Sequence, residues 1–340
     1  MTRLFSLGWL VLAAVLTGGP VSGADVYYFG MIKSQHFVQT SAAAPILAAT
    51  NAFVFNAFVV ATTNNLVTNA TVKPPFSTTT PIRTLLLQPG GASLQFEEHF
   101  NSQSALDTAY PTGSPFNVPS YSFAMFCLHD GARTTGLGFG LGFTPGNYPA
   151  TPQISNFSTT QAIDSTASFK LLWSLVGGQS SDVVQVTVSD AASNILFSSP
   201  APFSTNALTG ISNSMVIPGY TLPPGSNLTA HLSVARPAGF NTNAYPGAVG
   251  VSGLAMDVRF PIVTRPAPVL PRLSLSSANT KPFRLQFNGE TNRNYHIQAT
   301  TNFISWRDLL VTNSPTGLGA FTDTNSVGLS KRFYRIQVGP

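Results

Sequence analysis

Cysteine and charge are the two things that this chain of 340 residues has least of. It contains one cysteine, Cys127, so no disulfide can form within the chain, and its stability must come from buried apolar surface. Only 9% of its residues are charged, whereas Thr, Ser, Asn, Gly and Pro fill the gaps between short apolar runs. This composition is typical of exported β-proteins, and we expect an all-β chain. Cys127 ends the alternating run Tyr121–Cys127, which predicts a buried structural thiol rather than a nucleophile.

The N-terminal apolar run is short. Leu4–Leu16 follows Arg3 and spans about 13 residues, whereas a membrane-spanning helix needs about 20. Small residues follow the run, so residues 1–24 are predicted to be a signal peptide that is cleaved near Ala24. We therefore expect a secreted or cell-surface protein that begins close to Asp25 and keeps no membrane span. The alternative is an N-terminal anchor that stays attached.

Residues 25–149 are predicted to form an N-terminal β domain, a sandwich, jelly roll or similar fold. No stretch of it shows sustained helical periodicity, and Pro- and Thr-rich loops separate its apolar runs. The expected strands are Val26–Val38, Ala52–Ala61, Ile82–Gln88, Leu94–Phe100, Tyr121–His129 and Thr135–Phe143.

Residues 150–264 are predicted to form a second β-sandwich, with Trp173 as an aromatic core candidate. Leu222–Leu232 resembles the turn and sixth strand of a fibronectin type III domain, in which L-x-P-G-T-x-Y is common. The resemblance implies a fibronectin type III or immunoglobulin-like sandwich. Leu228 replaces the usual tyrosine, so the hydroxyl bond of the tyrosine corner is absent.

Residues 265–271 are a Pro-rich linker, and residues 272–340 are predicted to be a third, small β module. Its apolar residues alternate along short runs such as Phe283–Phe287 and Tyr295–Ala299, and Asn, Gly and Thr separate these runs. The sequence thus predicts three β-sandwich-like modules in tandem.

The last 60 or so residues resemble a module that recurs at the C-termini of secreted bacterial proteins. The family pattern Y-x-I-x-A-S-x-D-L-x-x-W, followed by F-x-D and F-Y-R, is similar to Tyr295–Trp306, Phe321–Asp323 and Phe333–Arg335. Asn302 and Phe303 stand where Asp and Leu are usual. The resemblance implies export and a modular architecture, and it carries no activity.

Charge is unevenly spread along the chain. From Leu270 onward there are eight basic residues and three acidic ones, a net charge of +5, whereas Asp25–Val269 carries a net charge of −1. Alternation places basic and amide residues on strand faces opposite the core, where they could bind an anionic polysaccharide or another cell-envelope component. The alternative is that the arginines only keep the module soluble and protect its edges. The candidate ligand-binding residues are Arg284, Gln286, His296, Gln298, Arg335 and Gln337.

Other clusters predict neither a catalytic site nor a metal site nor a cofactor site. Glu97 and Glu98 point to opposite faces of one strand, so they cannot flank one bond as a glycosidase pair does. His129-Asp130-Gly131 is first of all a turn. Gly136–Gly142 alternates strictly and is no phosphate loop; its bare glycine face suits the close approach of another backbone or a ligand.

The function expected from these features is that of a secreted, non-catalytic binding or structural protein of the bacterial exterior. No nucleic acid is expected as a partner. One alternative is an exported hydrolase that draws on Glu97, His99, Asp107 and Asp130 in the N-terminal domain. Another is a structural protein whose terminal module serves sorting or attachment.

Overall fold

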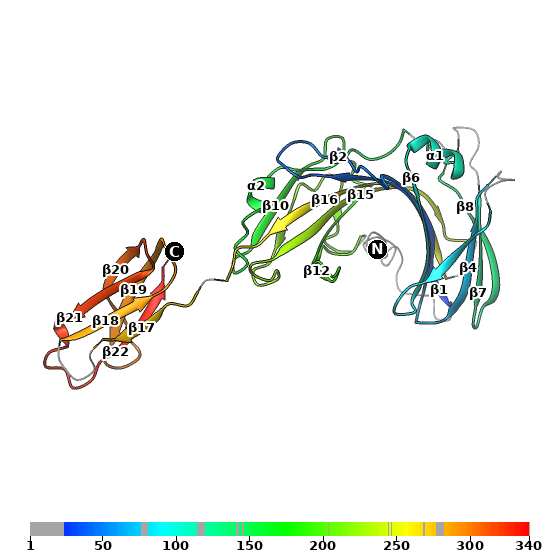
Figure 1. Ribbon diagram of the computed structural model, residues 1–340. Helices are drawn as coiled ribbons and strands as arrows, with labels where there is room; N and C mark the ends of the chain where they lie inside the picture. The colour runs from blue at the N-terminus through cyan, green and yellow to red at the C-terminus, as the bar shows by residue number, and fades with distance from the viewer. Residues whose placement is uncertain are drawn as a thin grey trace. The chain divides into compact units, whose positions relative to one another are not determined.

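The computed structural model describes residues 24–75, 81–113, 120–140, 143–144, 146–202, 204–243, 245, 247–267, 269–276 and 282–339. The predicted signal peptide, residues 1–24, lies outside the described residues except for Ala24. The chain splits into two compact units, Met1–Arg265 (unit 1) and Pro266–Pro340 (unit 2). Strands dominate both units, so the expected all-β class is confirmed (Figure 1). No helix in the described ranges has the length and apolar character needed to cross a membrane.

Unit 1 is organised by a sheet of 13 strands. The order along the main path is β12-β11-β15-β16-β1-β3-β6-β5-β4-β7-β8, and β2 and β13 pair beside it. The strands are β1 Val26–Val38, β2 Ile46–Leu47, β3 Phe53–Ala61, β4 Val67–Lys73, β5 Arg83–Leu87, β6 Ser93–Phe100, β7 Tyr121–Cys127, β8 Gly131–Leu137, β11 Val183–Ser189, β12 Ile195–Ser198, β13 Leu208–Thr209, β15 Asn227–Asn241 and β16 Val249–Val263.

One parallel pairing joins the two halves of this sheet. β1 runs beside β16 from Tyr28↔Val249 to Val38↔Arg259, whereas its other long neighbour, β3, is antiparallel. The expected boundary near residue 150 therefore falls inside unit 1, where strands from both sides of it share one sheet. A division into separately folding modules at this position stays a prediction.

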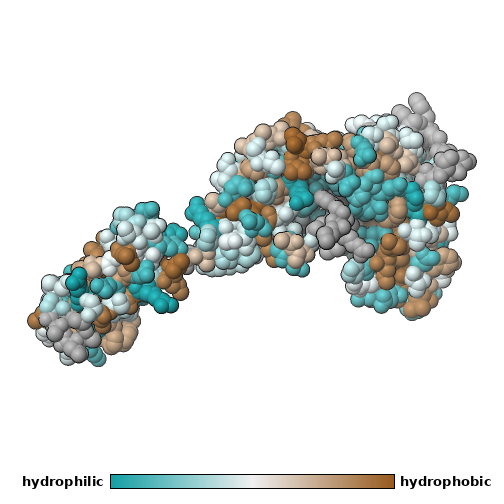
Figure 2. All heavy atoms as spheres, in the orientation of Figure 1, coloured by the Kyte–Doolittle hydropathy of each residue, from teal (hydrophilic) through white to brown (hydrophobic). Residues whose placement is uncertain are grey.

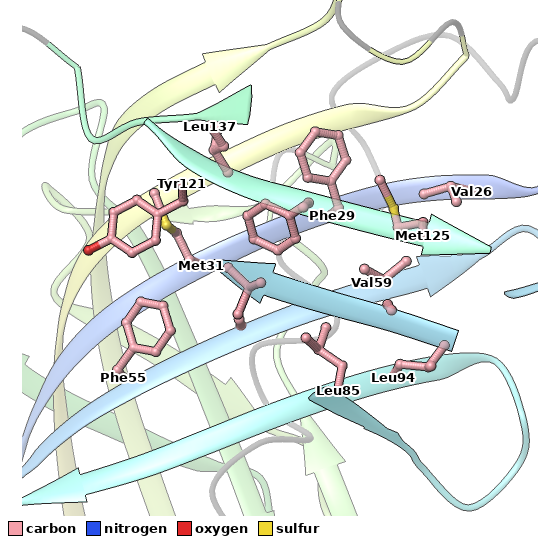
Figure 3. Close-up of a cluster of buried hydrophobic side chains, with 14 of the residues drawn as sticks. Val26, Phe29, Met31, Phe55, Val59, Leu85, Leu94, Tyr121, Met125 and Leu137 are labelled. Atoms are coloured by element: carbon pink, nitrogen blue, oxygen red, sulfur yellow. The ribbon is translucent and has the colours of Figure 1, made fainter. Parts of the chain in front are cut away.

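The sheet folds over at β5. The C-terminal end of β5 pairs with β6 (Leu87↔Leu94), and its N-terminal end pairs with β4 (Val72↔Arg83). The strands β4, β7 and β8 thus cover the face of β1, β3 and β6 that carries Phe29 and Phe55. The two layers enclose a core in which side chains such as Met31, Val59, Tyr121, Met125 and Leu137 point toward one another (Figure 3).

A second core lies where β11, β15 and β16 are covered by a three-stranded sheet, β9 Gln153–Ile154, β10 Phe169–Ser174 and β14 Ser214–Ile217, in the order β14-β10-β9. Trp173 is buried in this core, as the sequence predicts, and so is Leu228. Two sheets that bury alternating apolar residues against each other form a sandwich.

Two short α-helices are described in unit 1, α1 Gln103–Ala109 and α2 Phe157–Thr160. Helix α1 begins after Ser102, whose hydroxyl accepts a hydrogen bond from the amide of Ala105 and so caps the helix. The helix buries one residue, Leu106. A helix of this length has too few turns to show a periodic apolar pattern, so the sequence did not predict it.

Unit 2 is a small sandwich of two three-stranded sheets. One sheet has the order β17-β18-β21 and the other β20-β19-β22. Leu285, Phe287, Tyr295 and Ile297 form the core between the sheets. The elements are β17 Arg272–Leu275, β18 Phe283–Asn288, β19 Arg293–Thr300, β20 Arg307–Ser314, β21 Leu318–Asp323, the 3₁₀ turn Thr324–Ser326 and β22 Phe333–Val338.

Candidate functional site

The six predicted ligand-binding residues lie on two outward faces of unit 2. His296 and Gln298 on β19 stand opposite Gln337 and Arg335 on β22, so these four side chains share one face. Arg284 and Gln286 lie on β18, in the other sheet; they alternate with the core residues Leu285 and Phe287 and therefore point away from the core. Because the core lies between the sheets, the two outward faces look in opposite directions, and only four of the six residues are brought together.

Asp308 holds the β19–β22 face together. Its carboxylate accepts a hydrogen bond from Gln298 Nε2 at 2.7 Å and contacts His296 Nδ1 at 3.1 Å. Arg335 Nε in turn donates to Gln298 Oε1 at 2.7 Å. Hydrogen bonds from Gln298 and His296 lower the pKa of Asp308 below its ordinary value, so the carboxylate is ionised at neutral pH.

An irregularity in the sheet brings Asp308 to this position. The register of β19 and β20 shifts between Ile297 and Gln298, and Gln298 consequently faces Asp308. Alternation alone could not reveal the shift, and the sequence analysis did not include Asp308 among the candidate residues.

Aromatic side chains border the same face. The guanidinium carbon of Arg335 lies 4.3 Å from the ring centroid of Trp306. Phe303 packs against Phe333 with ring centroids 3.8 Å apart, yet 60% of Phe303 remains exposed. We call the set His296, Gln298, Trp306, Asp308, Arg335 and Gln337 the Asp308 face.

The turn before Trp306 is built by Asn302. Its Oδ1 accepts hydrogen bonds from the amides of Ile304 and Ser305, and the turn places Phe303 at a φ of 61°. Aspartate and asparagine both offer this oxygen, so Asn302 fills the structural role that an aspartate at the same position of the resembling module could fill. Phe303 adds an exposed ring where leucine is usual.

The acidic residues of unit 2 are all engaged. Glu290 pairs with Arg293, Asp323 pairs with Arg332, and Asp308 is held as described above. Among the described residues, no ion pair forms at four of the other cations, which are Arg272, Arg284, Arg307 and Lys331. Figure 2 shows polar and apolar residues interspersed over the visible surface of this unit. Unit 2 therefore carries an uncompensated positive charge.

The four residues of the alternative hydrolase site, Glu97, His99, Asp107 and Asp130, take part in three separate sets of interactions. Glu97 contacts His99 at 2.7 Å on β6, and Asp107 on α1 pairs with the buried Lys33. Asp130 accepts hydrogen bonds from Tyr245 and from the amide of Asp25. Glu98 points to the face opposite Glu97 and pairs with Arg83, as alternation predicted. In the part of the chain that the structure describes, no group of three His, Cys, Asp or Glu side chains could hold a metal ion.

A buried polar row crosses the middle of unit 1 on the face of β1 that lies opposite Lys33. His36 stands beside Asp257 in the parallel register, and its Nε2 lies 3.0 Å from the hydroxyl of Ser34. Asp257 accepts a hydrogen bond from Ser233 and contacts His231 Nδ1 at 3.0 Å. The sequence analysis missed this row because its members lie on strands that are far apart in the sequence.

Burial and neighbouring charges set the titration of the row. Burial lowers the pKa of His36 below its ordinary value, and the negative charge of Asp257 offsets this only in part. Burial alone would raise the pKa of Asp257, but His231, His36 and Ser233 hold it below its ordinary value. Both shifts favour a row of neutral His36 and ionised Asp257 at neutral pH.

The glycine-rich stretch lies against another backbone, as the sequence predicted. A methyl group on Gly140 would overlap the carbonyl oxygen of Ala238, and one on Gly239 would overlap that of Gly138. Ser252 Oγ and Asn241 Nδ2 donate to carbonyl oxygens of this stretch, each at 2.7 Å. An open hollow of about 420 Å³ lies beside it, lined by Ser120, Gly136, Leu137, Gly138, Gly140, Gly239, Phe240 and Asn241.

No family model matches this chain, and no curated protein does. Solved structures with some likeness include the FN1–FN3 domains of chicken CNTN1, at 8% identity and a TM-score of 0.23, with 83% of this chain and 88% of that chain covered. The BSP domain of a biofilm-associated protein has 10% identity and a TM-score of 0.20, with 89% and 62% covered. Dimeric latent PorU from Porphyromonas gingivalis has 11% identity and a TM-score of 0.21, with 97% and 32% covered. At such TM-scores these likenesses establish neither the topology nor the function of this chain.

Proposed function

We propose that the chain is an exported, non-catalytic binding or structural protein of the bacterial exterior, and that unit 2 binds anionic polysaccharide through the Asp308 face. The observation that carries the proposal is the arrangement of Arg335, which lies over the Trp306 ring and is hydrogen-bonded to Gln298. Export is proposed from the apolar run Leu4–Leu16, and fibronectin type III character of the second sandwich from Leu222–Leu232.

The chemistry of this face suits an acidic sugar. Aromatic rings offer flat apolar surfaces on which the C–H face of a sugar ring can pack, and Trp306 and Phe303 are the rings available. The planar groups of Arg335, Gln298 and Asp308 provide donors and acceptors for hydroxyl groups. An arginine also binds a uronate carboxylate through two parallel hydrogen bonds.

The uncompensated cations of unit 2 supply long-range attraction. Exposed charges attract an anionic polymer over about 8 Å at physiological ionic strength, and added salt shortens this range. Binding should therefore weaken steeply as salt rises, whereas a neutral polysaccharide should show little salt dependence.

The test compares Arg335→Gln with Arg284→Gln in the full chain. Both arginines are exposed and each variant removes one positive charge, but Arg284 lies on the opposite sheet, which makes it a matched control. We expect Arg335→Gln to weaken retention on an immobilised polyuronate about tenfold, because it removes a charge-assisted hydrogen bond. Arg284→Gln should weaken it about twofold or less through charge alone.

Thermal unfolding of each variant shows whether the sandwich is intact, and the variant carrying both substitutions should bind most weakly. Equal effects of the two single substitutions would contradict the Asp308 face as the binding site. If retention on the polyuronate changed neither with salt concentration nor with either substitution, the arginines would have a role in solubility alone.

A further inference from the structure

The start of β1 is held by two carboxylates that bind each other's backbone. The amide nitrogen of Asp25 donates to Asp130 Oδ2 at 2.8 Å, and Asp25 Oδ2 accepts from the amide of Asp130 at 3.0 Å and from that of His129 at 2.6 Å. Tyr245 also donates its hydroxyl to Asp130 Oδ2, at 2.7 Å. The nitrogen atom of Asp25 is therefore fixed at hydrogen-bond distance from a carboxylate that comes from a distant turn.

Two carboxylates, those of Asp25 and Asp130, meet in this cluster. Asp25 is 1% exposed, and burial alone would raise its pKa, but hydrogen bonds from Asp130 and His129 hold it below the ordinary value. Asp130 shares the same hydrogen-bond network. Two basic side chains lie beside it among the described residues: His129 Nδ1 is 2.8 Å from Asp25 Oδ1, on a side chain that is 66% exposed, and a guanidinium nitrogen of the half-exposed Arg133 is 4.0 Å from Asp130 Oδ1. A buried carboxylate is costly without a partner of opposite charge, and both basic side chains are about half exposed or more, so a further cation beside Asp130 would stabilise the cluster.

Such a cation could come from the chain itself. The sequence predicts cleavage near Ala24, and hydrolysis of the Ala24–Asp25 bond would turn the amide nitrogen of Asp25 into an α-amino group. We infer that Asp130 is the built-in acceptor for the α-ammonium group of Asp25 in the mature protein. The inference rests on the proposed export and is independent of the Asp308 face.

The chemistry requires only water and an export-associated peptidase. Water adds to the carbonyl carbon of Ala24, the C–N bond to Asp25 breaks, and residues 1–24 leave with a new carboxylate. The amine released on Asp25 takes up protons to become the ammonium. In the folded unit the carbonyl oxygens of Ala24 and Asp25 are both bound to Thr62, so cleavage must precede the docking of this segment on the end of β3.

Pairing with Asp130 gives the α-amino group a distinct titration. A free α-amino group has a pKa of about 7.7–8.0, and a neighbouring carboxylate raises this value. A group whose pKa is raised in the folded state stabilises the protein fully below its unfolded pKa, and this contribution is lost as the pH rises through the folded pKa. The other titratable groups that face the amine are Asp25 itself, His129, Arg133, Tyr245 and, through Tyr245, Cys127.

The experiment compares two mature chains that differ in the position of the amine. One begins at Asp25 and the other at Ala24, each released from a fusion by a protease that leaves the desired first residue, and each is made with and without Asp130→Asn. In the chain that begins at Asp25, we expect Asp130→Asn to lower Tm at pH 7 by about 3 °C more than in the chain that begins at Ala24, as the loss of about 1 kcal/mol implies for a unit of this size. The difference should vanish above about pH 10.

The pKa of the α-amino group, read from the pH dependence of its acylation rate, should exceed about 8 in the chain that begins at Asp25 and fall toward the usual value in Asp130→Asn. Equal Tm losses in the two chains, or an unshifted pKa, would overturn the pairing. These chains are made directly, so the result does not depend on export or on polysaccharide. N-terminal sequencing of protein exported from cells that express the full-length chain should give Asp25, and any other first residue would overturn the cleavage position.

Discussion

The fully buried ammonium group of Lys33 on β1 is neutralised by the carboxylate of Asp107 on helix α1. The same ammonium donates to the carbonyl oxygen of Tyr110 at 2.8 Å, just beyond the end of the helix. Burial lowers the pKa of Lys33, and the charge and hydrogen bond of Asp107 oppose this shift. One ion pair thus fastens α1 to the middle of the central sheet.

We predict that Asp107→Asn destabilises unit 1 by about 3 kcal/mol, because it leaves a buried ammonium without a counter-charge. Urea unfolding at pH 7 measures the loss. Asp164→Asn, an exposed change of the same kind, should cost about 0.5 kcal/mol or less. Combining Lys33→Met with Asp107→Leu should recover most of the stability, since no unpaired charge remains. If the double variant were as unstable as Asp107→Asn, the ion pair would not be the cause.

Unit 1 should lose stability on acidification through the buried polar row. The pKa of His36 is lowered in the folded protein, so its contribution is present above the unfolded pKa of about 6.5 and is lost as the pH falls toward the folded value. Asp257, whose pKa is lowered from 3.8, adds a further loss below that pH. Urea midpoints measured between pH 8 and pH 3 should therefore decline.

The substitution His36→Gln should flatten the part of this decline that lies near and below pH 6.5, because glutamine does not titrate there. His296→Gln, which lies in unit 2, should leave the midpoint of unit 1 unchanged. An identical pH profile for His36→Gln and the unsubstituted chain would assign the acid sensitivity to other groups.

Gly239→Ala should destabilise unit 1 by about 2 kcal/mol. The added methyl group would overlap the carbonyl oxygen of Gly138, and a backbone atom cannot move aside as a flexible side chain can. Gly146→Ala is the matched control, since its nearest atom would be Thr144 Oγ1 at 3.8 Å. We expect Tm to fall for the first variant alone; a similar Tm for both would mean that β15 separates easily from the segment that follows β8.

Limited proteolysis should cut the chain first between its two units. Prolines in the segment 265–271 cannot join a sheet ladder, and the units are compact on either side of it. The amide of Val269 is already bound to Glu290 of unit 2, so we expect the cut to precede Val269. Fragment mass spectrometry identifies the site, and the fragment from residue 272 onward should unfold cooperatively by itself. Early cuts within residues 150–264, with the linker intact, would contradict this division.

Most strand positions were predictable from the sequence because alternation is a local property. Five of the six strands expected in residues 25–149 match β1, β3, β5, β6 and β7 to within a few residues. The sixth, Thr135–Phe143, overlaps β8 only from Thr135 to Leu137, and β2 and β4 were not expected. Strand partners were not predictable in this way. Tyr28 faces Val249 across the parallel pair, and no local pattern signals a contact of such sequence separation.

The candidate site was likewise predictable where it depends on local alternation and unpredictable where it depends on strand pairing. Alternation correctly placed Arg284, His296 and Arg335 on faces opposite the core, because it reports which side of a strand a residue takes. Alternation does not report which sheet a strand joins. The sequence therefore could not show that Arg284 and Arg335 lie on different sheets. Asp308 joined the site through a register shift, which depends on the pairing of two strands.

The parallel pairing of β1 with β16 also governs how fast unit 1 can form. The strand that opens the described chain cannot complete its pairing until residues 249–263 have been synthesised, so a nascent chain holds β1 with one long edge open for most of its synthesis. Closing such a long loop carries an entropic cost before any contact repays it, and chains of high contact order fold slowly. Unit 1 should therefore reach its native state only after its last strand is available. In the export proposed above, this delay would keep the chain unfolded long enough to be threaded through a pore.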